Sequence, residues 1–147
     1  MQTKAIRLYG KKDLRFEEFT LPQIKDDEIL AEVITDSLCM STFKAVNQGN
    51  THTKVPNDID KNPIIVGHEF CGNILQVGKK WSKKFKPGDK FVIQPNIGHK
   101  LCYAPGYSFP FIGGDATYII MQNQVMENGS LLKYNGETYF DGSLVEP

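Results

Sequence analysis

The sequence predicts a mainly β fold, a barrel or a sandwich with short helices, on three observations. Apolar and polar residues alternate over several short segments, as expected for strands that turn one face to the core. Gly and Pro residues typical of turns separate these segments. Only one short stretch, from about residue 41 to 46, has a helical pattern, and no internal repeat divides the 147 residues, so we predict a single domain.

The predicted strands are short segments bounded by turn-forming residues. In chain order they cover residues 4–9, 14–19, 28–35, 70–77, 90–93 and 116–121. Turns are expected at 10–13 and 86–89, the second of which contains Pro and Gly. The segments 46–62 and 95–110 are loop-like, and loops of this length in a small domain are usually functional or mobile.

The composition gives no indication of a nucleic-acid or membrane partner. Lys and Arg together number 17, as do Asp and Glu, so the formal net charge is zero. No apolar segment approaches the ~20 residues that a membrane-spanning helix needs. We expect no secretory signal, because strand-like sequence begins at Lys4. Three widely spaced cysteines do not suggest a disulfide framework, and this favours a cytoplasmic protein.

Cys39 and the adjacent pair His68 and Glu69 are candidate metal ligands, and Glu146 offers a further carboxylate. A thiolate, an imidazole and a carboxylate suit a catalytic zinc, where one coordination position stays open for substrate. Adjacent residues on a regular strand point to opposite faces of the sheet, so His68 and Glu69 can share a metal only where the chain bends. Gly67 can supply such a bend.

A second interpretation remains open from the residue types alone. Free cysteine is among the most buried residue types, so Cys39 can equally be a core residue beside a hydrogen-bonded pair of His68 and Glu69. The position of Cys39 between a predicted strand and a predicted helix is, on the other hand, common for a reactive thiolate.

Four segments, in the same order along the chain, resemble the family of medium-chain zinc-dependent alcohol and polyol dehydrogenases. They are 67–78 (GHEFCGNILQVG), 85–91 (FKPGDKF), 113–118 (GGDATY) and 143–147 (SLVEP). Each segment is moderately specific, and together they extend the resemblance over essentially the whole chain.

The resemblance implies a mainly β domain with short helices, a GroES-like, partly open β-barrel over residues 1–147. In the family an NAD(P)-binding Rossmann domain follows, and its G-x-G-x-x-G motif is absent from this sequence. We therefore expect an N-terminal catalytic domain that is inactive alone and whose NAD or NADP is bound by the rest of a longer enzyme. Full-length family members are commonly homo-oligomers.

The resemblance also assigns roles to individual residues. It places Cys39, His68 and Glu69 at a catalytic zinc and matches Glu146 to an extra carboxylate at or near the metal. Ser41 matches the family's proton-relay position. Zinc would polarise the substrate alcohol, Ser41 would pass the proton outward, and Glu69 would tune the charge of the metal.

The sequence departs from the family pattern at three places. Thr42 stands where an Asp is usual, which alters the surroundings of the metal ligands. Lys44 stands where many members carry a relay histidine, and it is interpreted as a surface lysine or as a substitute proton shuttle. The family's lobe of four cysteines is reduced to Cys102, so we expect one catalytic zinc and no structural zinc.

Within the family, residues 36–41 and 113–118 look most like the L-sorbose 1-phosphate reductase branch. The resemblance implies a zinc- and NAD(P)-dependent oxidoreductase that interconverts the secondary alcohol and ketone of a polyol, sugar or sugar phosphate. Two alternatives are a zinc-free relative of the quinone reductases and a stand-alone GroES-like binding module without chemistry. Retention of both Cys39 and the Gly67-His68-Glu69 motif argues against the first.

Other side chains have simpler interpretations. The lysines between 79 and 90 could attract a phosphorylated substrate, but a solvated hairpin is the favoured interpretation. His52 and His99 are interpreted as surface histidines in loops. The aromatic residues of the second loop line a substrate mouth or cover the end of the barrel, and they are Tyr103, Tyr107, Phe109 and Phe111.

Overall fold

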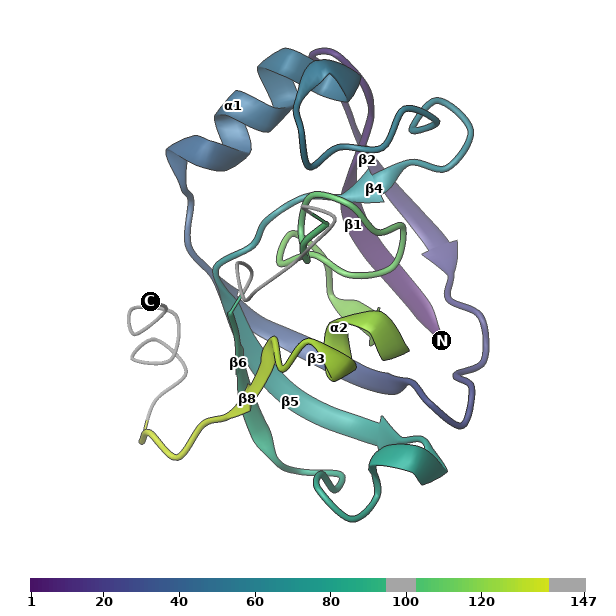
Figure 1. Ribbon diagram of the computed structural model, residues 1–147, viewed down its shortest axis with the longest axis vertical. Helices are drawn as coiled ribbons and strands as arrows, with labels where there is room; N and C mark the ends of the chain where they lie inside the picture. The colour runs from purple at the N-terminus through teal and green to yellow at the C-terminus, as the bar shows by residue number, and fades with distance from the viewer. Residues whose placement is uncertain (95–102, 138–147) are drawn as a thin grey trace.

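The computed structural model describes residues 1–94 and 103–137. Its strands are β1 (Gln2–Gly10), β2 (Asp13–Thr20), β3 (Ile29–Asp36), β4 (Ile64–Ile65), β5 (Phe70–Val77), β6 (Lys90–Ile93), β7 (Tyr118–Met121) and β8 (Leu131–Lys133). The helices are α1 (Met40–Gln48) and α2 (Asn123–Glu127), with 3₁₀ turns η1 (Gly49–Thr51) and η2 (Lys79–Trp81). The strands form one sheet in the order β2-β1-β4 and a second in the order β7-β3-β5-β6-β8 (Figure 1).

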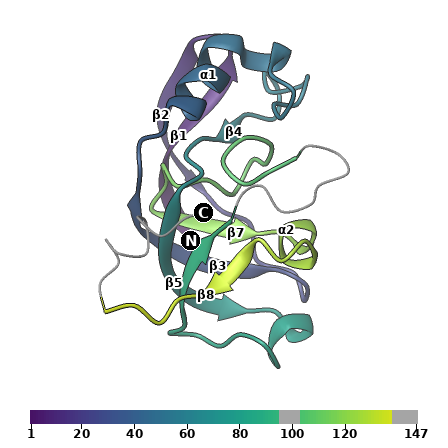
Figure 2. The same ribbon diagram turned by 60° about the vertical axis from the view of Figure 1, so that its left-hand side comes forward.

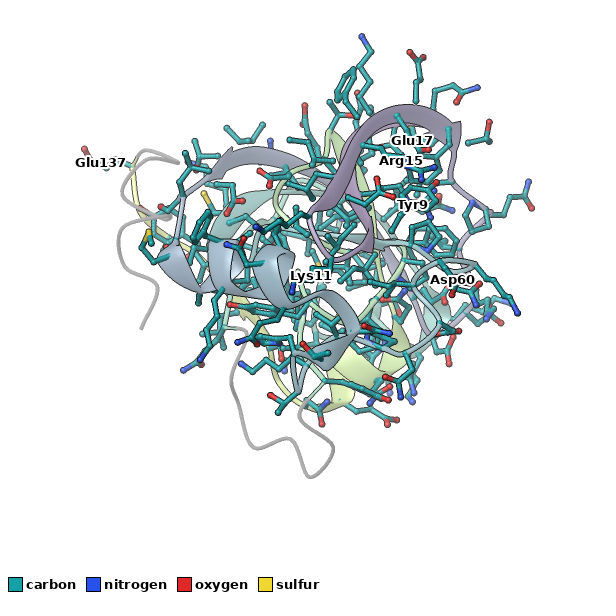
Figure 3. All side chains as sticks on the ribbon, turned by 90° about the horizontal axis from the view of Figure 1, so that it is seen from above. Tyr9, Lys11, Arg15, Glu17, Asp60 and Glu137 are labelled. Atoms are coloured by element: carbon teal, nitrogen blue, oxygen red, sulfur yellow. The ribbon has the colours of Figure 1, made fainter. Side chains whose placement is uncertain are left out.

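The first two strands form the predicted hairpin. They pair antiparallel from Gln2 opposite Thr20 to Gly10 opposite Asp13, with one irregularity near the turn. Side chains on its outer surface interlock, and Figure 3 shows Tyr9, Arg15 and Glu17 close together on this hairpin. The Tyr9 hydroxyl donates to Glu17 at 2.8 Å, and the Arg15 guanidinium lies 4.1 Å from the centre of the Tyr9 ring. This cluster holds the exposed face of the small sheet together.

The large sheet is organised around β3, which pairs with β5 on one side and β7 on the other. In the antiparallel pair of β3 and β5, Ile29 lies opposite Val77 at one end and Asp36 lies opposite Phe70 at the other, with two irregularities between them. The apolar face of the sheet forms the main core, in which Phe70 and Phe91 meet edge to face at 6.2 Å. The end of β3 is therefore fixed beside the start of β5, and this brings Cys39 near His68.

The two sheets are joined along β1, as the predicted partly open barrel requires. Ala5 bridges to Ala116, the Ile6 amide donates to the Asp115 carbonyl at 2.8 Å, and the Tyr118 amide donates to the Thr3 hydroxyl at 3.0 Å. Figure 2 shows the small sheet continuing into the strands of the large one. The fold class predicted from the sequence is confirmed.

The helix predicted near 41–46 is α1, which extends further in both directions. Cys39 is its N-cap residue, and the helix ends at Gly49, whose φ of 55° a residue with a side chain rarely adopts. The segment predicted as a loop from residue 46 therefore begins with the last turn of α1 and with η1. The short elements β4, α2 and β8 were not predicted, because runs of two to five residues carry no readable periodicity.

The basic hairpin lies at the opposite end of the molecule from α1 (Figure 1). Lys79 and Lys80 are exposed there and approach Asp26 at 3.5 Å and Glu127 at 2.6 Å. The indole N–H of Trp81, in η2, donates to the Asp27 carbonyl at 3.0 Å. The interpretation of this segment as a solvated hairpin is confirmed. None of the helices among residues 1–94 and 103–137 is both long and apolar enough to span a membrane.

Candidate metal centre

The structure brings together three of the four predicted ligands. One potential ligand atom each from Cys39, His68 and Glu69 lies within 4.8 Å of the others. Cys39 follows β3 at the start of α1, and the His-Glu pair immediately precedes β5. The His68 side chain is buried, whereas Cys39 and Glu69 are half-buried and so can reach a substrate. Glu146 lies outside the described residues.

Gly67 explains how two adjacent residues face one point. Its φ is 87°, in the region that favours glycine, so the chain bends before β5 begins at Phe70. A Cβ at this position would collide with the Asp36 carboxyl. A backbone hydrogen bond also holds the bend in place, because the Gly67 carbonyl accepts from the Gly114 amide at 2.8 Å. The bend expected from the sequence is therefore present.

His68 is oriented by hydrogen bonds on both ring nitrogens. Nδ1 lies 3.1 Å from the Thr42 hydroxyl, and Nε2 lies 3.1 Å from the Ser41 hydroxyl and 3.6 Å from a Glu69 carboxylate oxygen. Burial lowers the pKa of His68, Glu69 opposes this effect, and the charge of Lys54 adds to it. A neutral imidazole whose Nδ1 proton bonds to Thr42 leaves Nε2 available to a metal.

Ser41 connects the candidate ligands to a further hydroxyl. Its Oγ lies 3.1 Å from the Cys39 sulfur, 3.1 Å from His68 Nε2 and 2.8 Å from the Tyr107 hydroxyl. The Tyr107 hydroxyl itself lies 3.1 Å from His68 Nε2. Two hydroxyl groups therefore stand against the candidate ligands, and this arrangement can accept a proton from a substrate and pass it on.

The role of Tyr107 was the hardest to predict from the sequence. It belongs to the aromatic set with two open interpretations, and the structure buries it at 3% exposure against the candidate ligands. The ring of His52 stacks on it with a centroid distance of 5.7 Å. His52, interpreted from the sequence as a surface histidine in a loop, is half-buried with its ring against Tyr107. Lys44 is exposed on α1, as predicted for a surface lysine.

The segment that carries the candidate metal centre is similar to known proteins. A family model described as the alcohol dehydrogenase GroES-like domain matches residues 25–128. The chain belongs to this family. The match covers both halves of the candidate metal centre, since Cys39, His68 and Tyr107 all fall inside it.

Similar proteins of this family include enzymes named for sugar phosphates. An L-sorbose 1-phosphate reductase of Klebsiella pneumoniae is 59% identical over 148 residues, which cover 99% of this chain and 36% of the relative. A mannitol-1-phosphate 5-dehydrogenase of Aliivibrio fischeri is 44% identical over 146 residues, which cover 99% of this chain and 34% of the relative. The chain thus spans about a third of the length of these curated relatives.

A solved structure of the same family has the same fold. The 2R,3R-butanediol dehydrogenase from Bacillus subtilis superposes with a TM-score of 0.79 and 25% identity, covering 99% of this chain and 44% of that chain. This superposition agrees with the GroES-like fold predicted from the sequence.

A pair of carboxyl groups, unnoticed in the sequence, lies behind the candidate ligands. Asp36 Oδ1 accepts a hydrogen bond from the Glu69 amide at 3.1 Å, while Oδ2 is buried and no amide or hydroxyl donor of the described residues reaches it. The Asp36 and Asp115 side chains hydrogen-bond to each other, which requires a proton on one of them. Burial, followed by the charge of Asp115, raises the pKa of Asp36 from 3.8 to about 7.

An apolar groove of about 460 Å³ opens beside Cys39. Several of its side chains are exposed to an extent unusual for large apolar residues, with Leu38 at 96%, Met40 at 75% and Phe43 at 60%. The groove is lined by Ile6, Leu14, Leu38, Cys39, Met40, Thr42, Phe43, Val46, Val66 and Asp115. An apolar lining of this kind is typical of ligand pockets, and the groove reaches Cys39 and Thr42.

Proposed function

We propose that these residues form the catalytic domain of a zinc-dependent NAD(P) oxidoreductase that interconverts a secondary alcohol and a ketone of a polyol, sugar or sugar phosphate. The convergence of Cys39, His68 and Glu69 within 4.8 Å carries the proposal. This donor set fits zinc, because thiolate, imidazole and carboxylate are its usual ligands and three of them leave a position for substrate. The named activities of the relatives support an enzyme rather than a binding module.

Each residue then has a defined task. When bound, zinc supplies a Lewis acid for the substrate oxygen and the nicotinamide supplies the hydride acceptor. Thr42 holds the His68 ring in the orientation that frees Nε2. Ser41, which is half-buried, accepts the proton of the substrate hydroxyl as it releases its own outward to solvent, and the Tyr107 hydroxyl, 2.8 Å away, holds the Ser41 hydroxyl in place. The apolar groove beside Cys39 excludes water from the reacting carbon.

We extend the proposal to the rest of the enzyme. The 147 residues contain no G-x-G-x-x-G motif, so NAD or NADP is assigned to a part of the protein outside them, and residues 1–147 form one domain. Glu146 joins the zinc site or lies near it. One zinc is expected and no structural zinc, because the region 95–110 contains a single cysteine. A homo-oligomer in the cytoplasm, where Cys39 stays reduced, completes the proposal.

The metal content of the chain tests the proposal. Protein purified without added zinc is expected to contain about one zinc per chain by elemental analysis, and Cys39→Ala and His68→Ala are each expected to lose it. Cys71→Ala is the matched control, because Cys71 is a buried cysteine outside the ligand cluster, and it is expected to keep the metal. Absence of zinc from the unaltered chain, even after zinc is added back, would remove the proposal and favour a zinc-free relative.

Thr42 gives a second, graded prediction. Thr42→Val removes the hydroxyl that orients His68 and is expected to weaken zinc binding about tenfold, the usual effect of losing such a contact. Thr42→Asp restores the acid common in the family and is expected to strengthen binding, because a carboxylate makes the imidazole a better donor. Competition with a chelator of known affinity measures both constants. Equal zinc affinity in all three proteins would contradict the assigned role of Thr42.

A further inference from the structure

Two basic residues, His52 and Lys54, contact the ring of Tyr107. The ammonium of Lys54 lies 4.9 Å from the centre of the Tyr107 ring, and His52 stacks on the same ring with an interplanar angle of 3°. The hydroxyl of Tyr107 contacts both Ser41 and His68. Tyr107 therefore contacts the basic residues with its ring and the candidate ligand His68 with its hydroxyl.

The loop that carries these residues is fixed to the loop that carries Tyr107. The Ser108 hydroxyl donates to the Lys54 carbonyl at 2.6 Å and accepts from the Ala104 amide at 2.9 Å. The Lys54 amide donates to His52 Nδ1 at 3.2 Å. Because Nδ1 is an acceptor in this contact, the neutral His52 ring carries its proton on Nε2 and offers an N–H donor.

The electrostatics of the group agree with this geometry. Burial lowers the pKa of His52, and the positive charges of Lys44 and then Lys54 lower it further. The charge of Lys54 also acts on His68. Lys44, on α1, and Lys54, on the following loop, thus both act on His52 with their positive charge. The carboxylate of Asp58 in that loop accepts a hydrogen bond from the Asn62 side chain at 2.7 Å.

We propose that Lys44, His52 and Lys54 form a subsite for the phosphate group of the substrate, which is therefore a phosphorylated polyol or sugar. The inference rests on the proposed function, since it names the substrate class of that same site. A phosphate monoester carries close to two negative charges and three acceptor oxygens, which suit two ammonium groups and an imidazole N–H. Tyr107 spans the space between this subsite and the reacting hydroxyl, and so sets the distance between the phosphate and the carbon that reacts.

The basic hairpin at residues 79–90 is not the phosphate subsite. It lies at the other end of the molecule from α1, and two of its lysines are paired with Asp26 and Glu127. A phosphate bound there would be too far from His68 to belong to the same small substrate. The hairpin therefore supplies the matched control for the experiment.

Binding to the zinc-loaded chain tests the proposal without requiring turnover. D-Glucitol 6-phosphate is expected to bind at least about tenfold more tightly than D-glucitol in calorimetric titrations at low ionic strength, because exposed charges are screened by salt. The double variant Lys44→Gln, Lys54→Gln is expected to lose this preference and to keep its affinity for D-glucitol. The control Lys79→Gln, Lys83→Gln removes the same charge from the hairpin and is expected to retain the preference.

The outcomes separate this inference from the proposed function. If zinc binds and both ligands have equal affinity, or if the hairpin variant loses the preference equally, the phosphate subsite is refuted and the zinc site stands. If zinc does not bind, the proposed function fails. Titration of the metal-free chain with inorganic phosphate, followed by NMR, then still tests the subsite, because shifts confined to His52 and its neighbours support it and shifts confined to the hairpin refute it.

Discussion

Gly67→Ala is expected to destabilise the chain by about 3 kcal/mol and to abolish zinc binding. A side chain in the left-handed region costs about 1–2 kcal/mol, and a steric collision in a packed interior costs about 1–3 kcal/mol more. Both apply here, because φ is 87° and the added Cβ would collide with the Asp36 carboxyl and lie 2.7 Å from the Asp115 amide. Relief of the collision would move the backbone that carries His68 and Glu69.

Gly88→Ala isolates the steric part of this prediction. Its φ of 88° nearly equals that of Gly67, and nothing lies within 4 Å of an added Cβ. It is expected to cost only about 1 kcal/mol and to leave zinc binding unchanged. Urea unfolding and metal content of the two variants provide the comparison. Equal stabilities and equal zinc contents would show that the bend at Gly67 does not position the ligands.

Asp36→Asn is expected to stabilise the chain at pH 8, on the order of 2–3 kcal/mol, and by a smaller amount, about 1 kcal/mol, at pH 5. The reason is the raised pKa of Asp36, 3.8 ordinarily and about 7 in the folded chain. Between these values the folded protein keeps a proton on Asp36 that the unfolded chain has released, so the contribution of Asp36 to the free energy of unfolding falls as pH rises from about 4 to 7. Above pH 7 the penalty is complete, and asparagine avoids it.

Urea unfolding at pH 5 and pH 8, with a chelator present to exclude metal, measures the effect. Asp115→Asn is expected to act in the same direction, because burial also raises the pKa of Asp115, and the double variant is expected to be non-additive, because the two side chains contact each other. Asp26→Asn is the control, since it makes the same chemical change at an exposed carboxylate. A stability difference between Asp36→Asn and the natural chain that does not grow from pH 5 to pH 8 would contradict the assignment.

The strands of both sheets were largely readable from the sequence, because period-two alternation survives wherever one face of a strand packs on the core. All six predicted strands exist, with boundaries within a few residues of β1, β2, β3, β5, β6 and β7. The two-residue strand β4 could not be predicted in this way, since it exists only through its pairing with β1, which is distant in sequence. Its residues Ile64 and Ile65 are fully buried, but burial alone does not distinguish a strand from a loop.

The candidate site was readable only in part. The types of Cys39, His68 and Glu69 suggest zinc, but the sequence left a core cysteine equally open, because their meeting depends on how β3 and β5 align. Tyr107 was one of four aromatic residues with no distinguishing pattern, and its contact with His68 spans 39 positions of sequence. Asp36 and Asp115 are farther apart still. The sequence did contain an indication of this carboxyl pair, because Asp36 is an acidic residue at the end of a largely apolar strand, but it was not recognised.

The position of Trp81 has a practical consequence. It is the only tryptophan of the chain, and its indole packs against the core of the large sheet at the end remote from α1. Its fluorescence therefore reports whether that sheet is intact and is insensitive to what occupies the site at Cys39. A variant that loses metal and keeps the native emission spectrum has lost only the site, whereas one that loses both has unfolded.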